Sequence, residues 1–364
     1  MLGEAMSKCE HLAGVPLKPH AAKELTAIYV AKGVQATTAI EGNTLSQEEV
    51  EAIVKRGTAN VSESREYLQR EVLNIARIIS EIDAALQMGE RLEIDMERIK
   101  ALNYDILDGI PDKPEVVPGE FRQHNVSAGP YLAPHWTEVP TLTKQFVEWL
   151  SNLRSAVTNE SRREDRFVNA VLAAILAHLY IAWIHPFGNG NGRLARIIEV
   201  QILSESGVIP IVATNLLSNH YNKTRSAYYL ALDQAQSGVS AFVRYALSGF
   251  IDGLREQIDV VRAENLQIHW ESYVHEVFRR KPNTEARDRQ REVALALKPR
   301  EQYTPEQVTE LTTSLAKKYA RCGDRTPARD MNDLAKLGVV EKMTYRHYRV
   351  LREKIEAFIP PVSK

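Results

Sequence analysis

The chain has 364 residues, of which 44% are hydrophobic, so it is long enough and apolar enough for two or three domains with real cores. A formal net charge of −1 argues against a chain that binds polyanions over its whole surface. Cys9 and Cys322 lie far apart in the sequence and offer no disulfide framework, which favours a reducing compartment. We find no apolar run long enough to cross a bilayer and no leader pattern, and we therefore expect a cytoplasmic protein without membrane contact.

The first third of the sequence predicts helices after an extended lead-in. Two prolines and two glycines within residues 1–20 indicate the extended segment. Residues 21–36 show helical spacing, although Gly33 weakens that prediction. Ser46 followed by Glu49 is typical of a capping box at the start of the next helix. Two later segments with apolar residues in helical register are interpreted as core helices without chemistry of their own: 61–88 and 95–107.

The helix beginning near residue 21 is expected to end at Gly42, a residue type that commonly stops helices. Glu41 stands directly before this stop and four residues after Thr37. From the residues alone, a single Glu at a helix end is usually a solvated surface group.

Residues 118–140 are rich in helix breakers and predict a hairpin or a surface loop. Helices are expected on its C-terminal side at 142–153 and 162–184. His178 precedes His185 by two helical turns, and we interpret it as a structural, hydrogen-bonded histidine rather than a catalytic one.

The most informative stretch is His185-Pro186-Phe187-Gly188-Asn189-Gly190-Asn191-Gly192-Arg193, with Arg196 one turn later. It joins the apolar helix before Pro186 to a second helix over 194–205. Glycines allow a ligand to approach the backbone closely, and the start of a helix presents free N–H groups to an anion. Arg193 and Arg196 share one helix face and can bind phosphate oxygens, while His185 has the pKa range of a general base.

Two other interpretations of this loop are open. It could be a plain glycine-rich turn between core helices. A dinucleotide site is disfavoured because the loop has the pattern Gly-x-Gly-x-Gly and follows no predicted strand. The chain also has no Walker A lysine.

The stretch resembles the signature of the Fic family, His-x-Phe-x-Asp/Glu-Gly-Asn-Gly-Arg-x-x-Arg. The resemblance implies transfer of AMP from ATP to Ser, Thr or Tyr hydroxyls of a protein target, with His185 taking the hydroxyl proton. Asn189 departs from the signature, which has a carboxylate there to hold the Mg²⁺ that bridges the α- and β-phosphates. An Asn can still offer its amide oxygen to this metal, but without the charge.

The resemblance also implies which residues contact the nucleotide. Arg196 is expected at the γ-phosphate, and a tyrosine pair beside the adenine or ribose, although that pair could equally be aromatic core. The residues expected to bind ATP are Asn189, Gly190, Asn191, Gly192, Arg193, Arg196, Tyr228, Tyr229 and Gln236.

Two regulatory features follow from the same resemblance. Thr37, Glu41 and Gly42 match the inhibitory motif Ser/Thr-x-x-x-Glu-Gly/Asn, which implies that Glu41 pairs with Arg196 and blocks the γ-phosphate position. In some family members this Glu is also implicated in removing AMP by positioning a water. The breaker-rich segment resembles the flap that pairs with the target's backbone, and its expected residues are Val126, Ser127, Ala128 and Gly129.

The C-terminal segment differs in charge from the rest. Residues 285–364 hold 17 Lys and Arg against 12 Asp and Glu, a net charge of +5. Helices are predicted at 304–319 and 325–338 and a hairpin at 342–351, an order that resembles a winged helix-turn-helix. Such modules bind DNA or proteins or form dimers, and the sequence leaves these roles open.

We therefore predict a mostly α fold, a Fic-type helical core with a short β-hairpin flap, and a C-terminal winged helix. The expected domains are an inhibitory helical region at 1–110, a catalytic core at 111–255, a linker helix at 256–284 and the winged helix at 285–364. The expected activity is autoinhibited protein adenylylation with ATP and Mg²⁺. Transfer of phosphate or UMP, removal of AMP, self-modification, a homodimer, and an inactive nucleotide-sensing regulator acting through the winged helix remain open.

Overall fold

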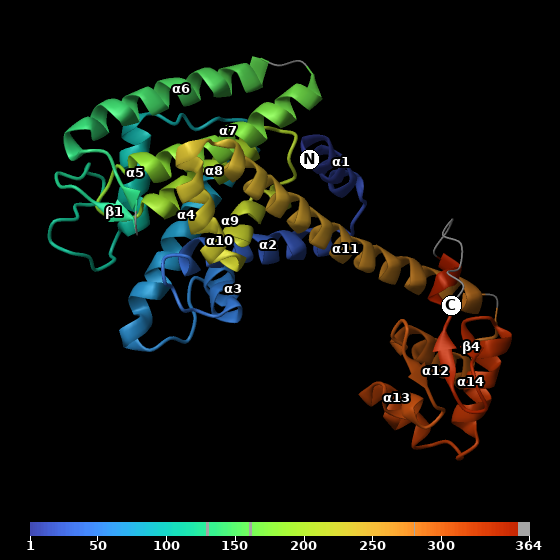
Figure 1. The fold of residues 1–364 in the computed structure, drawn as a ribbon. Coiled ribbons are helices and arrows are strands. Elements are labelled where there is room, and N and C mark those ends of the chain that lie inside the picture. The colour runs from blue at the N-terminus through green and yellow to red at the C-terminus, as the bar shows by residue number, and fades with distance from the viewer. Residues whose placement is uncertain (129–130, 160–161, 280, 356–364) are drawn as a thin grey trace. The chain divides into compact units, whose positions relative to one another are not determined.

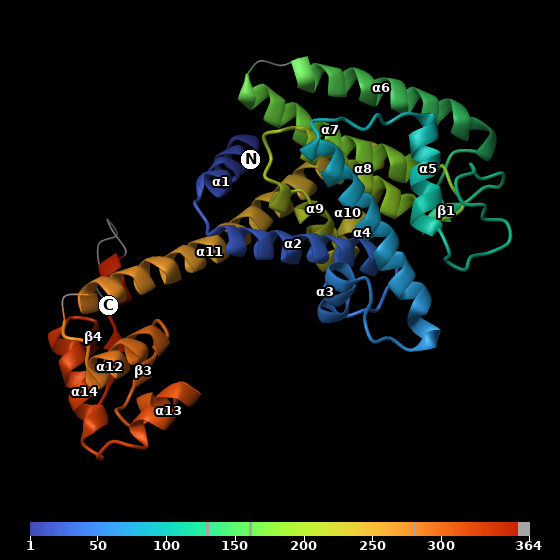
Figure 2. The same ribbon diagram turned by 180° about the vertical axis from the view of Figure 1, so that it is seen from behind.

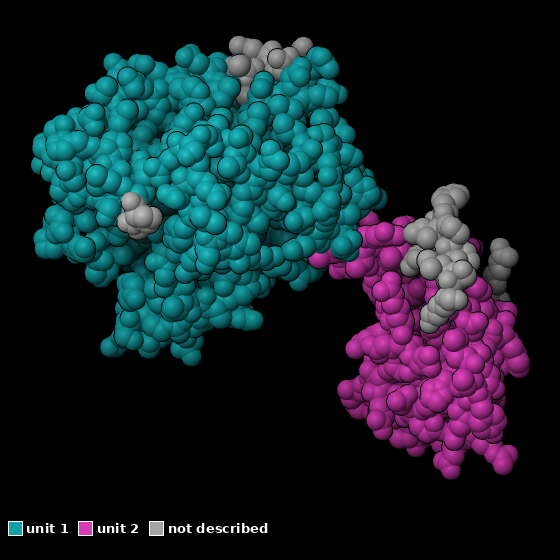
Figure 3. Space-filling model, in the orientation of Figure 1, with its two compact units in different colours: residues 1–259 teal, residues 260–364 magenta. Residues whose placement is uncertain are grey.

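The computed structural model describes residues 1–128, 131–159, 162–279 and 281–355. The predicted mostly α fold is confirmed (Figure 1). The chain divides into two compact units, Met1–Asp259 and Val260–Lys364 (Figure 3). The helices that begin in the first unit are α1 (Leu2–Gly14), α2 (Pro19–Ala39), α3 (Gln47–Arg56), α4 (Glu66–Gln87), α5 (Met96–Leu107), α6 (Val139–Asn159), α7 (Arg163–Ile184), α8 (Asn191–Glu205), α9 (Leu216–Lys223), α10 (Arg225–Gln234) and α11 (Ser240–Arg279).

The remaining elements are short or belong to the second unit. Strands β1 (Ser127–Ala128) and β2 (Tyr131–Leu132) form an antiparallel hairpin in the first unit. The elements of the second unit that follow α11 are α12 (Glu285–Ala296), β3 (Gln302–Tyr303), α13 (Thr313–Tyr319), α14 (Thr326–Lys336), β4 (Val340–Lys342) and β5 (Tyr348–Val350). The 3₁₀ turns among the described residues are η1 (Glu63–Arg65), η2 (Trp136–Glu138), η3 (Ile211–Ala213), η4 (Ala235–Ser237), η5 (Gln307–Glu310) and η6 (Arg352–Ile355).

The helices α7 and α8 form the centre of the first unit, and α2, α4, α5 and α6 pack against one or both of them (Figure 2). Successive turns of α7 bury apolar residues, most of them alanine or isoleucine. Contrary to our expectation, α7 is long and apolar enough to cross a bilayer by length and composition. Its burial accounts for this composition, because a helix covered on several sides by others has no polar face.

The expected extended lead-in is wrong, because residues 2–14 form helix α1. Ala5, Cys9 and Leu12 are its buried residues, and their spacing places all three on one face, which packs against α7. Breakers elsewhere in residues 1–20 hid this short apolar stripe. The capping box at Ser46 and Glu49 is confirmed: Ser46 Oγ accepts from Glu49 N, and Ser46 N donates to Glu49 Oε2.

Gly33 does not interrupt α2. The helix continues to Ala39 because Gly33 lies where α2 meets the residue preceding α9. A Cβ at position 33 would lie 2.2 Å from Asn215 Cγ, so only glycine permits this approach. Gly33, which weakened the helix prediction, is therefore the residue that allows α2 to pack closely against Asn215. This packing positions Thr37 on α2 and Glu41 just after it.

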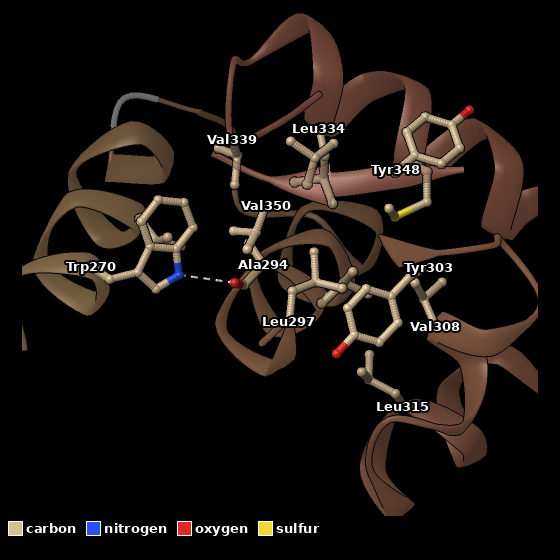
Figure 4. Packing of buried hydrophobic residues seen from close by; sticks show 14 of the residues in the cluster. Trp270, Ala294, Leu297, Tyr303, Val308, Leu315, Leu334, Val339, Tyr348 and Val350 are labelled. Atoms are coloured by element: carbon tan, nitrogen blue, oxygen red, sulfur yellow. Dashed lines mark hydrogen bonds between the residues drawn. The ribbon is translucent and has the colours of Figure 1, made fainter. Parts of the chain in front are cut away.

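The second unit has its own apolar core, contributed by α11 to α14 and the three strands (Figure 4). Trp270 on α11 is fully buried and donates its indole N–H to Ala294 O at 3.1 Å. The sheet order is β3-β5-β4 with both pairings antiparallel. Of the two helices predicted here, 325–338 corresponds to α14, whereas 304–319 is broken into η5 and α13.

We expect Gly33→Ala to destabilise the first unit although alanine favours a helix by roughly 1 kcal/mol over glycine. The reason is the collision of the added methyl group with Asn215. Urea denaturation should give a lower unfolding midpoint than wild type. Gly3→Ala in α1 is the control, since a Cβ at that position meets nothing within 4 Å. An unchanged or higher midpoint for Gly33→Ala would contradict the packing described.

Candidate functional site

The glycine-rich stretch forms a tight loop between α7 and α8. His185 ends α7 in the left-handed region, with φ 50° and ψ 58°, and its N–H donates to Ile181 O. Asn191 fastens the loop to itself: its Nδ2 donates to Phe187 O at 2.8 Å, and its Oδ1 accepts from Phe187 N at 2.9 Å. Gly190, at φ 81°, then starts α8. The loop is therefore held by its own side chains before any ligand is bound.

A cavity of about 480 Å³ opens beside this loop, large enough for a nucleotide-sized ligand. Segments distant in the sequence build its walls. The lining residues are Glu41, Tyr131, Ala182, Trp183, His185, Gly192, Tyr228, Tyr229, Leu232 and Asp233. Of the residues predicted from the sequence, the structure thus brings His185, Gly192, the tyrosine pair and Glu41 to one cavity.

His185 has the surroundings of a general base. Its Nδ1 lies 3.3 Å from Ala182 O, so a proton on Nδ1 serves that hydrogen bond and leaves the Nε2 lone pair free. Burial lowers the pKa of His185 below its usual 6.5, and the nearby Arg122 lowers it further, against the hydrogen bond to Ala182 and the charge of Glu41. The imidazole is therefore neutral at pH 7 and able to accept a proton.

Arg196 is 1% exposed and meets the carboxylate that the sequence assigned to it. Its Nη2 donates to Glu41 Oε1 at 2.6 Å and to Thr37 O at 2.9 Å, so the predicted pair is present. Burial alone would raise the pKa of Glu41, but Arg196 and Arg193 bring that pKa below its ordinary value. A Cβ at Gly192 would lie 2.4 Å from Glu41 Oε1, so the absent side chain is what admits the carboxylate.

Arg193 points to a second carboxylate, which the sequence did not identify. Its Nη1 donates to Glu71 Oε1 on α4 at 2.6 Å, in a pair with side chains 5% and 8% exposed. Glu71 Oε2 accepts from Asn43 Nδ2 at 2.8 Å, and Asn43 follows Glu41 by two residues. Burial is the largest influence on Glu71 and raises its pKa despite Arg193. A signal was available, because Glu71 interrupts the apolar face of the helix predicted at 61–88.

Asn189 does not stand free for a metal in this arrangement. Its Oδ1 accepts from Gly190 N at 2.7 Å and from Arg193 Nη2 at 3.1 Å. Its Nδ2 donates to Asp112 Oδ2 at 2.5 Å. Within the described ranges, no three His, Cys, Asp or Glu side chains gather as metal ligands. Asp112, which sequence reasoning missed, nevertheless places a carboxylate beside Asn189, where this chain lacks the carboxylate of the signature.

Of the other residues expected to contact ATP, the two tyrosines line the cavity and Gln236 lies outside it. Tyr228 is buried, and its OH lies 2.9 Å from Nε2 of the fully buried His178, whose Nδ1 lies 3.5 Å from Glu199 Oε2. The prediction that His178 is structural is thus confirmed. Tyr229 is half exposed on the cavity wall. Gln236 is exposed outside the wall, and its Nε2 donates to the lining residue Asp233.

The predicted flap is the β1–β2 hairpin, in which Ser127 pairs with Leu132 and Ala128 with Tyr131. Ala133 N donates to Val126 O and extends the pairing, while Gly129 lies outside the described residues. Arg122, also missed from the sequence, joins this segment to the loop. It is 3% exposed, and its three nitrogens donate to the carbonyls of His124, Pro134 and His185 at 2.6–2.9 Å.

Replacing Glu71 with Ala should lower the free energy of unfolding by about 3–5 kcal/mol, because Arg193 would keep its charge in a buried position without a carboxylate. Chemical denaturation followed by tryptophan fluorescence measures this. Glu66→Ala, an exposed carboxylate on the same helix, is the control and should change little. A double variant, Glu71→Leu with Arg193→Met, should recover most of the loss. If the single variant is as stable as the control, Arg193 does not depend on Glu71.

Comparison with known proteins agrees with this geometry. Curated relatives include protein adenylyltransferase fic-1 of Caenorhabditis elegans, 30% identical over 214 residues, which cover 58% of this chain and 38% of the relative. Protein adenylyltransferase Fic of Drosophila ananassae is 28% identical over 210 residues, covering 57% of this chain and 38% of the relative. The chain thus spans little more than a third of the length of these relatives.

Solved structures support the fold. A Fic domain containing signaling protein from Bacteroides thetaiotaomicron superimposes with a TM-score of 0.56 at 22% identity, covering 72% of this chain and 98% of that one. A Fic family protein from Desulfovibrio desulfuricans covers 96% of this chain and 95% of its own, with a TM-score of 0.52 at 20% identity. A sequence model of the Fic/DOC family matches residues 93–203, which include the whole loop. Residues 93–203 of this chain are therefore similar to the Fic/DOC family.

Proposed function

We propose that this chain is a protein adenylyltransferase that transfers AMP from ATP to a hydroxyl group of a protein and is held inactive by Glu41. The observation that carries the proposal is the ion pair between Glu41 and Arg196 at the loop beside His185. A loop built for anions meets a carboxylate of the same chain. The names of the relatives, protein adenylyltransferases, support the choice of AMP as the transferred group.

The chemistry requires one proton transfer and one exchange of bonds to phosphorus. Nε2 of neutral His185 takes the proton of the target hydroxyl, whose oxygen attacks the α-phosphorus of ATP. The bond from the α-phosphorus to the bridging oxygen breaks, and pyrophosphate leaves. The free N–H groups at the start of α8 favour the negative charge on the phosphates.

Mg²⁺ fits the site through oxygen donors. This cation needs one or two protein carboxylates or carbonyls and takes its other ligands from phosphates and water. Asp112 would hold it and supply the negative charge that Asn189 lacks, and the amide oxygen of Asn189 would join it only on leaving Gly190 N and Arg193 Nη2. When bound, the metal neutralises phosphate charge.

Inhibition follows from charge and occupancy. Both arginines of the signature are already neutralised, Arg196 by Glu41 and Arg193 by Glu71. The phosphates of ATP would have to compete with Glu41 for Arg196, and two anions cannot share one guanidinium face at such short range. ATP would bind with its α-phosphate misaligned for attack. After relief, the ionised Glu41 could position water for removal of AMP, as proposed for related sites.

The hairpin is the proposed docking strand for the target. Its residues Ser127 and Leu132 are exposed, and Tyr131 lines the cavity. An extended segment pairing with the hairpin would bring a Ser, Thr or Tyr hydroxyl towards His185. Tyr131 OH donates to Trp183 O at 2.9 Å, and Arg122 fixes the base of the hairpin to the loop, so hairpin and general base are positioned together.

The decisive experiment incubates wild type and Glu41→Gly with Mg²⁺ and ATP labelled at either the α- or the γ-phosphate. We expect label from the α position on protein, stronger for Glu41→Gly because Arg196 is released. Glu41→Gln keeps the shape without the charge and should also exceed wild type. Adding His185→Ala to Glu41→Gly should remove the label by taking away the base.

The other outcomes of this experiment are informative. Label from the γ position would indicate phosphate transfer and contradict adenylylation. Absence of label from either position, with ATP still bound in a filtration assay, would contradict transferase activity and support a nucleotide-sensing regulator. Equal α-label for wild type and Glu41→Gly would leave adenylylation standing but contradict the inhibitory role of Glu41.

The pH dependence should report His185. A base whose pKa is lowered is deprotonated, and therefore competent, over all pH values above that pKa. The rate of α-label transfer by Glu41→Gly should rise through a pKa below 6.5 and be constant from pH 7 to 8. The charge of Glu41 raises the pKa of His185. Glu41→Gly and Glu41→Gln both remove this charge, so the rise should lie at a lower pH in both variants than in a chain that keeps Glu41. A rate that climbs steadily above pH 7 would exclude His185 as the base.

A further inference from the structure

The second unit has the element order and sheet order of a helix-turn-helix module with a β-hairpin attached. Helix α12 leads to β3, the helices α13 and α14 follow, and β4 and β5 form the closing hairpin. Strand β5 lies between β3 and β4, so the hairpin is anchored to the module's first strand. In helix-turn-helix proteins the second helix of the pair enters the major groove of DNA, and here that helix is α14.

The outward face of α14 carries cations and one amide. Arg325 stands at its N-terminal cap, and the exposed residues that follow at intervals of four, three and four are Arg329, Asn332 and Lys336. Such spacing places all four on one helix face. Among the residues that the structure describes, Arg325 and Arg329 have no carboxylate partner, whereas the 79% exposed Lys336 lies 3.4 Å from Asp333 Oδ1.

Of the two acidic residues of α14, Asp330 faces the core, and Asp333 lies between the core and Lys336. Asp330 is fully buried and accepts from Arg289 Nε at 2.7 Å, Gln290 Nε2 at 2.9 Å and Tyr319 OH at 3.1 Å. Asp333 is partly turned inward, where Gln290 also reaches it at 3.3 Å. A helix that only needed a solvated surface would have no reason to sort its charges this way, whereas a helix facing a polyanion would.

Asn332 is held for recognition rather than left to rotate. Its Oδ1 accepts from Tyr348 OH on β5 at 2.9 Å, which fixes the amide plane and leaves the NH₂ group directed to other acceptors. Arginine and asparagine are the side chains that form paired hydrogen bonds with guanine and adenine edges in the major groove. Arg325 and Arg329 lie in the N-terminal half of α14, the part that approaches base edges in this class of module.

The hairpin tip extends the same chemistry. Residues 343–347 are all exposed, and Met343 N donates to His347 O, which closes the turn. Tyr345 is 86% exposed, and Lys342 Nζ lies 5.9 Å from the ring centres of Tyr345 and Tyr348. The tip therefore offers an aromatic ring and a lysine where the strand of a nucleic acid next to the groove would pass.

We propose that the second unit binds double-stranded DNA through the exposed face of α14, with the β4–β5 hairpin on the adjacent sugar-phosphate backbone. The partner is chosen by charge: Arg325 and Arg329 on the α14 face have no carboxylate partner among the described residues, and residues 285–364 carry a net charge of +5. This inference is independent of nucleotidyl transfer, because it uses no residue of the first unit.

The test measures binding of the full chain to a fluorescent 30-base-pair duplex pool of random sequence, by anisotropy at 50 and 200 mM salt. We expect wild type to bind, with affinity falling steeply as salt rises. The variant Arg325→Glu with Arg329→Glu should bind roughly tenfold or more weakly, the size expected for losing direct contacts. Rounds of selection from the pool should enrich a motif for wild type, and Asn332→Ala should change that motif.

The matched control reverses two exposed cations of the α12–β3 connection, Lys298→Glu with Arg300→Glu, and should bind within a few-fold of wild type. Absence of duplex binding by wild type at 50 mM salt would overturn the proposal. So would equal loss in both charge-reversal variants, which would mean non-specific attraction, or tighter binding to single-stranded DNA than to the duplex. Transfer of AMP by these variants is measured separately and should equal that of wild type.

Discussion

The contact between Glu41 and Arg196 is the interaction on which the arrangement of the first unit depends. Arg196 is held inside the molecule at 1% exposure, and such a charge needs a partner of opposite sign at every stage. The chain supplies that partner from the end of α2, and the loop glycines make room for it. A phosphate group could form the same ion pair with this guanidinium. The cation that Glu41 neutralises in the folded chain is therefore the one that an anionic ligand would bind. The charge of Arg196 is neutralised without a bound ligand because Glu41 already supplies the anion.

The second carboxylate ties this contact to the helical framework. Asn43 hydrogen-bonds Glu71, and Glu71 binds Arg193, so the end of α2 is fastened to both arginines of the signature rather than one. The raised pKa of Glu71 indicates that burial destabilises its ionised form by more than the charge of Arg193 stabilises it. Two pairs of opposite charge in one small volume form a neutral cluster, and movement of the segment after α2 would disturb both pairs together.

Much of this was accessible from the sequence, and the failures have physical causes. The helices with regular apolar spacing, the loop, and the pairing of Glu41 with Arg196 were predicted, the last through resemblance rather than spacing. Helix α1 was missed because three small or apolar positions gave too weak a stripe among breakers. Asp112, Glu71 and Arg122 were missed because each contacts a loop residue at least 63 positions away, and single-sequence patterns report neighbours within a few turns. Gln236 lies next to the cavity wall rather than in it.

Gly192 has a consequence for how this site can change by mutation. The position without a side chain admits the carboxylate of Glu41, and the same open space is where a phosphate could approach the backbone at the start of α8. A larger residue there would displace the Glu41 carboxylate and fill the same space. A substitution at Gly192 therefore cannot free Arg196 while keeping the space beside it open. Separation of Glu41 from Arg196 with this space intact requires a change in α2 or in the residues that follow it, which leaves the loop sequence unchanged.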